Sequence, residues 1–142
     1  MTDQRMLATR SAQADREVRL DLNLRRARTC YDHLAGVAGV NLLDGMLSRG
    51  WFRVEPGAKT SYRLTGNGER ALLRLRVDLP NAVAQRRPFA YGCLDWTERR
   101  YHLRGSLAAA ILTALSGSGT VSRKAGTRVV ALERSISGWL EG

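Results

Sequence analysis

Residues 30–36 read CYDHLAG and residues 93–105 read CLDWTERRYHLRG, so Cys, Asp, His, Leu and Gly occur twice in the same order. An offset of 69 positions pairs His33 with His102 and continues through the residues that follow each phrase. The cysteines and aspartates are offset by 63, so the second copy carries six more residues before its histidine. Repeats of this size are typical of duplicated supersecondary units that bury their apolar faces on each other.

Each copy has the pattern of helices on both sides of a β-hairpin. In the first copy, apolar residues at helical spacing predict helices over 24–34 and 40–48. Residues 51–64 contain two strand-like sequences around PGAK, a Pro-Gly turn, and predict a hairpin. A further helix is expected over 66–77, after a threonine that can cap it. In the second copy, the capping-box spacing of 95–98 indicates the start of a helix.

The order of two helices, a hairpin and a helix is that of a winged-helix unit. We therefore expect a helix-dominated α+β fold made of two degenerate winged-helix units in tandem. The expected division is a polar lead-in helix or frayed arm over 1–24, a first winged-helix-like unit over 25–77, a linker over 78–88 and a second unit over 89–142. A chain of 142 residues has room for one ordinary domain or for two very small ones packed together.

The chain is strongly basic. It has 23 Lys and Arg against 13 Asp and Glu, a net charge of +10, and all of the basic residues except Lys59 and Lys124 are arginine. A GC-rich genome explains such a composition, and so does an anionic partner, most often nucleic acid. Each lysine lies in a predicted hairpin turn beside arginines, as a phosphate-contacting wing requires, although exposed turns are often charged without any partner. The candidate contacts to double-stranded DNA are Arg25, Arg26, Arg28, Arg53, Lys59, Arg63, Arg123, Lys124 and Arg128.

Several features bear on the compartment of the protein. The longest apolar run, residues 107–115, is shorter than the roughly 20 residues needed to cross a bilayer. The N-terminus lacks the apolar segment of a secretory signal. Two cysteines far apart do not make a disulfide framework. We expect a cytoplasmic protein with reduced thiols and no membrane partner.

The repeated cysteines and histidines are candidate metal ligands. Cys30 and His33 are three residues apart, which puts them on the same face of the predicted helix. A thiolate and an imidazole bind Zn²⁺ or Cd²⁺, and Asp32 can orient the histidine. Further ligands must come from the second copy or from another subunit, and Cys93 is the first candidate. His102 is nine residues from Cys93, about half a rotation on a continuous helix, so both serve one ion only if the helix starts after Cys93.

Two alternatives apply to the same residues. Cysteine often packs as a small buried hydrophobe, and a core histidine can simply donate a hydrogen bond. A cysteine–histidine dyad can also be catalytic, but no motif supplies an oxyanion pocket or a substrate cleft. Phosphate-binding glycine loops of the Walker or dinucleotide type are absent from the sequence. We expect a protein that is not an enzyme and that requires no cofactor.

The phrases ARTCYDHLAG, LLDGMLSRGW, YRLTGNGERAL and CLDWTERRYHLRG resemble the downstream half of bacterial ArsR-type winged-helix regulators, in the metal-responsive, cadmium-sensor-like branch. The similarity covers roughly residues 25–141. It implies a cytosolic, usually homodimeric repressor that binds operator DNA through a winged helix. It also implies release from DNA when a thiophilic metal such as Cd²⁺ or Zn²⁺ binds as the effector.

The chain departs from this family at its N-terminal side. Regulators of this type carry a winged-helix domain with the DNA-reading helix before the first phrase, whereas 24 residues precede Arg25 here. The cysteine pair that metal-sensing members place on the reading helix is also absent, and Val40–Ser48 is the positional candidate for reading DNA. The alternative is therefore an effector-binding and dimerisation module that lacks its own DNA reader and modulates a full-length regulator.

Overall fold

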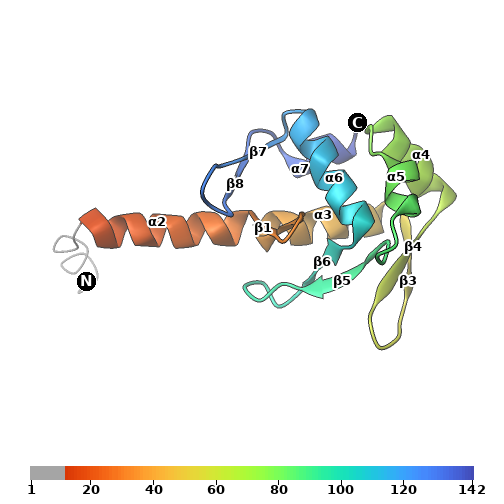
Figure 1. The fold of residues 1–142 in the computed structure, drawn as a ribbon, viewed down its shortest axis with the longest axis horizontal. Helices are drawn as coiled ribbons and strands as arrows, with labels where there is room; N and C mark the ends of the chain where they lie inside the picture. Colours follow the sequence, from red (N-terminus) through yellow and green to blue (C-terminus); the bar gives the residue numbers. More distant parts are fainter. Residues whose placement is uncertain (1–11) are drawn as a thin grey trace.

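The computed structural model describes residues 12–142 and begins with a long helix, α2 (Ala12–Arg26). None of the described residues of α2 is buried, and the helix extends away from the rest of the molecule (Figure 1). Part of the predicted lead-in, residues 1–11, lies outside the described residues. Within the described residues, no helix combines the length and the apolar character needed to span a bilayer.

After α2 the chain runs twice through the same order of elements: hairpin, helix, hairpin, helix. The first run comprises β1 (Arg28–Cys30), β2 (His33–Ala35), α3 (Gly36–Ser48), β3 (Phe52–Glu55), β4 (Ser61–Leu64) and α4 (Gly66–Arg74). A short helix, α5 (Leu79–Ala84), connects the runs. The second run comprises β5 (Tyr91–Leu94), β6 (Tyr101–Arg104), α6 (Ser106–Gly117), β7 (Val121–Arg123), β8 (Val130–Leu132) and α7 (Ile136–Leu140). The predicted α+β class is confirmed, while the description as two tandem winged-helix units stays a prediction.

The helix predicted over 24–34 is wrong beyond Arg26. Strands β1 and β2 form an antiparallel hairpin instead, and its register places Cys30 opposite His33. Tyr31, with φ +60°, and an aspartate, a residue type that favours turns, make the loop between the strands. The backbone N–H of Thr29 also donates to the Arg128 carbonyl, 2.8 Å away in the second half of the chain. Pairing with a distant segment therefore outweighs the local helical pattern.

The helix predicted to start at 95–98 is also wrong, although its cap exists. The Asp95 carboxylate accepts from the backbone N–H groups of Thr97, at 3.1 Å, and Glu98, at 3.3 Å, as a helix N-cap does. Only one turn forms, because Arg99 adopts φ +58° and the chain then reverses. Residues 101–104 pair antiparallel with β5, so the second phrase of the repeat is a hairpin like the first.

The remaining elements of the first copy occur where the sequence predicts them, although α3 begins at Gly36 instead of 40 and α4 ends at Arg74 instead of 77. Residues 40–48 lie within α3, and the hairpin predicted over 51–64 is β3 and β4, with Phe52 opposite Leu64. Helix α4 begins after Thr65, whose Oγ1 accepts from the backbone N–H of Gly68 at 3.1 Å. Local capping and turn chemistry explain why the hairpin and the start of α4 were predictable.

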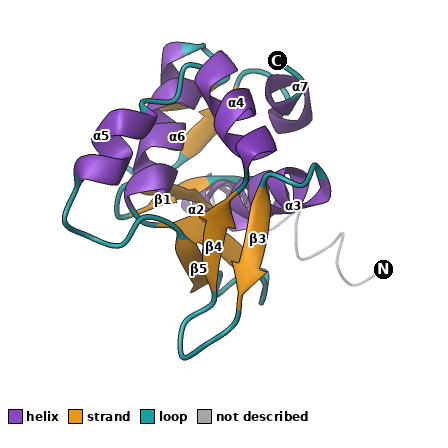
Figure 2. Cartoon of the chain, turned by 90° about the vertical axis from the view of Figure 1, so that its right-hand side faces the viewer, coloured by secondary structure: helices purple, strands orange, loops and turns teal. Residues whose placement is uncertain are grey.

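Backbone pairing between hairpins joins the two runs. In the four-stranded sheet β3-β4-β5-β6, the first run's second hairpin pairs with the second run's first hairpin through Ser61 and Tyr91. The equivalent contact between the first run's first hairpin and the second run's second hairpin is a single bridge between Arg28 and Val129. Beside it, the Thr29 N–H donates to the Arg128 carbonyl at 2.8 Å and the Val130 N–H donates to the Ala27 carbonyl at 3.1 Å. Figure 2 shows helices α4, α5 and α6 stacked above the strands of this sheet. The halves therefore share one four-stranded sheet, while β1–β2 and β7–β8 stay two-stranded sheets joined by the bridge.

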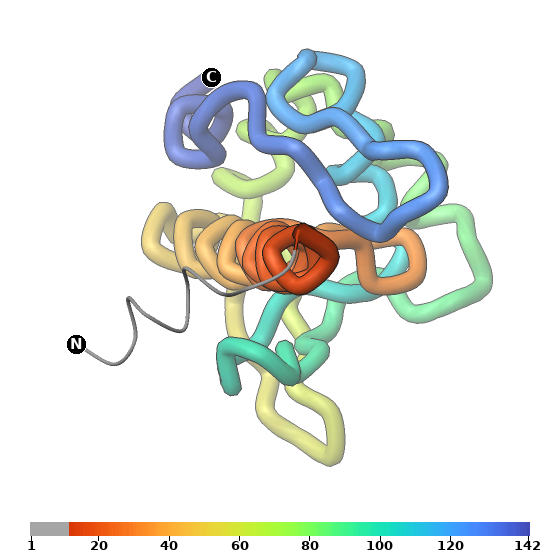
Figure 3. Tube along the Cα trace, turned by 90° about the vertical axis from the view of Figure 1, so that its left-hand side faces the viewer, coloured from red at the N-terminus to blue at the C-terminus, as the bar shows by residue number. Residues whose placement is uncertain are grey.

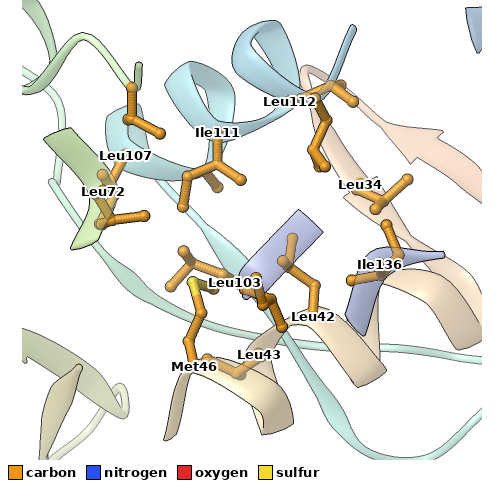
Figure 4. Packing of buried hydrophobic residues seen from close by; sticks show 14 of the residues in the cluster. Leu34, Leu42, Leu43, Met46, Leu72, Leu103, Leu107, Ile111, Leu112 and Ile136 are labelled. Atoms are coloured by element: carbon orange, nitrogen blue, oxygen red, sulfur yellow. The ribbon is translucent and has the colours of Figure 1, made fainter. Parts of the chain in front are cut away.

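The hydrophobic core lies between α3 and α6. Helix α3 contributes Leu42, Leu43 and Met46 at helical spacing, and α6 contributes buried residues of the same kind from its inner face. Figure 4 shows these side chains meeting Leu34 from β2 and Leu103 from β6. Because the residues that follow each histidine belong to this core, the core holds the strands that carry the histidines together.

Candidate metal centre

The two inner hairpins, β1–β2 and β5–β6, bring the four repeated cysteines and histidines close together. The register of β1 and β2 pairs Cys30 with His33, and the register of β5 and β6 pairs Cys93 with His102. The four ligand atoms, two Sγ and two imidazole nitrogens, all lie within 4.8 Å of one another. The histidines are buried and the cysteines are half-buried.

The structure corrects the predicted relation between Cys93 and His102. On a helix these residues would face opposite ways, whereas in the β5–β6 hairpin they are direct cross-strand partners. Side chains at such positions lie on the same face of the sheet, about 5 Å apart at Cβ. The six additional residues of the second phrase form a longer loop and leave the ligand pair intact. All four predicted metal residues are therefore brought together, His102 included.

The two histidine rings touch directly. Nε2 of His33 lies 3.0 Å from Nε2 of His102, and Nδ1 of His102 lies 3.0 Å from Oδ2 of Asp95. Burial, followed by the neighbouring His102 ring, lowers the pKa of His33 to about 4. Burial also lowers the pKa of His102, although Asp95 opposes this shift. Both rings are therefore neutral near pH 7, which is the form that binds metal.

Asp95 lies next to His102 and accepts hydrogen bonds from several other groups as well. Burial alone would raise its pKa, but hydrogen bonds from Thr97 and Gly36 and the charge of Arg28 hold the pKa well below its usual range. The Gly36 N–H donates at 2.6 Å and the Arg28 guanidinium at 2.9 Å. As a carboxylate, Asp95 can only accept hydrogen bonds, so His102 donates from Nδ1 and its Nε2 carries a free lone pair. A carboxylate behind a histidine in this way orients metal-binding imidazoles.

The equivalent nitrogen of His33 is not satisfied. Its Nδ1 is buried without a hydrogen-bond partner and lies 3.6 Å from Oδ1 of Asp32. The other oxygen of Asp32 is paired with Arg87 at 2.6 Å. The expectation that Asp32 stands next to the histidine is met in position, although the 3.6 Å separation is too long for a hydrogen bond.

The two thiols lie close to each other in the site. Burial, and then the proximity of Cys30, raises the pKa of the Cys93 thiol. Both cysteines are free in the structure. A coordinating metal ion reverses this effect, because its charge favours the thiolate.

The donor set fits a tetrahedral ion of the zinc group. Two thiolates and two imidazoles are ligands that Zn²⁺ favours, and they disfavour Mg²⁺ and Ca²⁺. Bond lengths of about 2.0–2.1 Å to nitrogen and 2.3 Å to sulfur imply ligand atoms about 3.3–3.8 Å apart. The observed nitrogens are 3.0 Å apart and all donors are within 4.8 Å. The ligand atoms are therefore already close to the separations that one tetrahedral ion requires.

Sequence reasoning missed the groups that support the histidines. The sequence predicts Asp95 as a helix cap and does not link Arg28 or Arg87 to the site. The repeat itself held a signal for Asp95, because Cys-x-Asp occurs at 30–32 and again at 93–95. No sequence signal pointed to the two arginines, since only the tertiary fold brings them to the carboxylates.

Among the predicted DNA contacts, Arg28 does not lie on the surface. It is 1% exposed and its guanidinium is enclosed by Asp95, the Leu24 carbonyl and the Trp96 ring, so its predicted phosphate contact is wrong.

Arg25 is exposed and pairs with Glu98 at 3.1 Å. The other predicted contacts are exposed: Arg26, Arg53, Lys59, Arg63, Arg123, Lys124 and Arg128. The two hairpins that carry most of them point to different sides of α2 (Figures 1 and 3).

Comparison with known proteins gives one informative similarity. The chain is 32% identical over 113 residues to a protein of Bacillus subtilis (strain 168) described as "Uncharacterized HTH-type transcriptional regulator YdfF". The alignment covers 80% of this chain and 49% of the relative, so the chain spans about half the length of that curated relative. No family model matches the chain, and no solved structure matches it. This chain is thus similar to half of a protein named as a transcriptional regulator.

Proposed function

We propose that this chain acts in transcription regulation as a DNA-binding repressor of the ArsR type. In this proposal it works as a homodimer in the cytoplasm and leaves DNA when a thiophilic ion binds. The ion is held by Cys30, His33, Cys93 and His102. The observation that carries the proposal is the convergence of these four ligand atoms from two separate hairpins. The similarity to a protein named as an HTH-type regulator supports the regulatory setting.

The geometry gives metal binding a direct structural effect. Each hairpin supplies one cysteine and one histidine, so an ion bound by all four residues ties the two halves of the chain together. Structural zinc sites stabilise the fold that contains them, since the ligands come together only in the folded state. An ion at this place therefore changes the stability of the interface between the halves.

Titration with Cd²⁺ tests the site. We expect a thiolate-to-metal absorption band that reaches its maximum at one ion per chain. Cys30→Ser and Cys93→Ser should each reduce the band and weaken binding. The matched control is Tyr31→Phe, which lies in the same turn, is 81% exposed and removes no ligand. A wild-type protein without the band would end the metal proposal.

The exposed basic hairpins are the proposed DNA contacts. Lys59 lies in the β3–β4 loop and Lys124 follows β7, each with exposed arginines beside it. Affinity for a duplex should fall with salt, by about 0.9 in log K per neutralised phosphate for each log unit of salt. Fluorescence anisotropy with a mixed-sequence duplex, and with the DNA upstream of the coding sequence, measures this slope with and without Cd²⁺. Equal affinity in both metal states would contradict release by metal.

The second candidate is an effector-binding and dimerisation module that works on a full-length regulator. The burial of α3 favours it, because this positional candidate for reading DNA packs into the core along most of its length. Asn41 is exposed on α3, but Asp44 is occupied by an ion pair with Arg100. Metal binding without duplex affinity at low salt would support this module and exclude direct DNA binding. Size-exclusion chromatography with light scattering measures the expected dimer in either case.

A further inference from the structure

Each histidine of the site is the last member of a triad of side chains, in the order arginine, aspartate, histidine. In the first triad, Oδ1 of Asp95 is 2.9 Å from the Arg28 guanidinium, and Oδ2 is 3.0 Å from Nδ1 of His102. In the second triad, Oδ2 of Asp32 is 2.6 Å from Arg87, and Oδ1 is 3.6 Å from Nδ1 of His33. The two triads have the same arrangement, but the aspartate–histidine hydrogen bond is formed only at His102.

The hydrogen positions explain this difference. The 3.0 Å contact between the two Nε2 atoms needs one proton. His102 donates from Nδ1 to the Asp95 carboxylate, so in the neutral ring its Nε2 has no proton. His33 must therefore carry its proton on Nε2 and donate it to His102. The Nδ1 of His33 is then a bare acceptor that faces another acceptor, the Asp32 carboxylate, and no bond forms between them.

A bound ion requires a different arrangement. An ion between the two Nε2 atoms needs a free lone pair on each, so the proton of His33 has to leave Nε2. Nδ1 of the same ring can take up a proton, and Oδ1 of Asp32 is positioned to accept the resulting hydrogen bond. The ring stays neutral, because one proton leaves Nε2 and another arrives at Nδ1 by exchange with water.

We propose that ion binding converts His33 from the Nε2–H to the Nδ1–H tautomer, and that Asp32, held in place by Arg87, is the positioning residue that accepts the new hydrogen bond. This inference rests on the proposed metal site. The His102 half of the site is already arranged for an ion, and the His33 half rearranges when the ion arrives. The exchange also gives a partner to the one buried side-chain polar atom of the described residues that lacks one.

Asparagine at position 32 should act against this exchange. The amide of Asp32→Asn can donate to the bare Nδ1 of His33 and so stabilise the tautomer that does not bind the ion. We expect Cd²⁺ affinity to fall about 10–100-fold, the usual effect of changing such a supporting residue. Asp44→Asn is the matched control, because this carboxylate pairs with Arg100 on the surface and does not touch the histidines. Its affinity for Cd²⁺ should equal that of the wild type.

Long-range ¹H–¹⁵N NMR of the imidazole nitrogens measures the tautomers directly, and the protein has only two histidines. The metal-free protein should show one Nδ1–H ring and one Nε2–H ring. Addition of Cd²⁺ should convert the spectrum to two Nδ1–H rings with both Nε2 signals shifted by the metal. The same titration is followed by the thiolate absorption band.

The outcomes separate the two proposals. Two Nδ1–H rings in the metal-free protein would overturn the tautomer assignment. A thiolate band without a change of tautomer, or wild-type Cd²⁺ affinity in Asp32→Asn, would overturn the exchange and leave the metal site standing. No band in the wild type would overturn the metal site and the exchange with it, whereas the mixed tautomers of the free protein would still be observed.

Discussion

Replacing Arg28 by methionine should destabilise the fold, because it leaves a buried carboxylate without its counter-charge. Arg28 is 1% exposed and its partner Asp95 is fully buried, with 2.9 Å between guanidinium nitrogen and carboxylate oxygen. The guanidinium also donates to the Leu24 carbonyl at 3.1 Å, at the C-terminal end of α2. Methionine keeps most of the aliphatic volume, so the change removes the charge and the hydrogen bonds and little packing.

The expected loss is about 3 kcal/mol. Removing one partner of a buried ion pair costs about 3–5 kcal/mol, since the other charge stays buried and unpaired. Asp95 keeps the hydrogen bonds from Gly36 and Thr97, at 2.6 and 2.7 Å, so the lower end of that range applies. The control is Arg25→Met, which removes an ion pair with Glu98 whose arginine is 62% exposed. Exposed pairs contribute less than about 1 kcal/mol.

Urea unfolding followed by circular dichroism measures both variants. With a urea slope of about 1–3 kcal/mol per molar, a loss of 3 kcal/mol lowers the midpoint by at least about 1 M. The Arg25 control should stay close to the wild type. If Arg28→Met also remained within about 1 kcal/mol of the wild type, the reasoning that Arg28 neutralises Asp95 would be refuted.

Three further changes test other parts of the structure. Zn²⁺ at a hundredfold excess over its Kd should stabilise the fold by about 2.7 kcal/mol, seen as a higher Tm, and His102→Ala should abolish this shift. Lys124→Gln should lower the slope of log K against log salt for duplex binding by about 0.9, and an unchanged slope would remove Lys124 from the DNA contacts. Gly39→Ala should destabilise by about 1–3 kcal/mol in urea unfolding, because its Cβ would lie 2.8 Å from the Leu34 carbonyl carbon and 3.3 Å from Cβ of His102. Gly117→Ala is the control, since its Cβ meets no atom within 4 Å, and equal losses in both variants would contradict the packing argument.

The β3–β4 hairpin and the helices α3 and α4 were predictable because their signals are local. A Pro-Gly turn between strand-like sequences specifies β3 and β4, and the Thr65 cap specifies the start of α4. The inner hairpins were not predictable in this way. Residues 24–34 have helical spacing of apolar residues, and 95–98 have a capping box, yet both phrases pair as strands. Their hydrogen bonds reach to the other half of the chain, which a local pattern does not reveal.

The sequence by itself determined the α+β class, the repeated order of residues and the identity of the four candidate ligands, because these follow from local periodicity and from the repeat. Only the tertiary structure decided that the ligands converge and that Arg28 is buried. The hairpins β1–β2 and β5–β6 are distant in sequence, and both pack on the shared core between α3 and α6. This packing places His33 against His102. The chemistry of the site therefore depends on a long-range contact whose driving force, burial of apolar surface, is not encoded in either phrase alone.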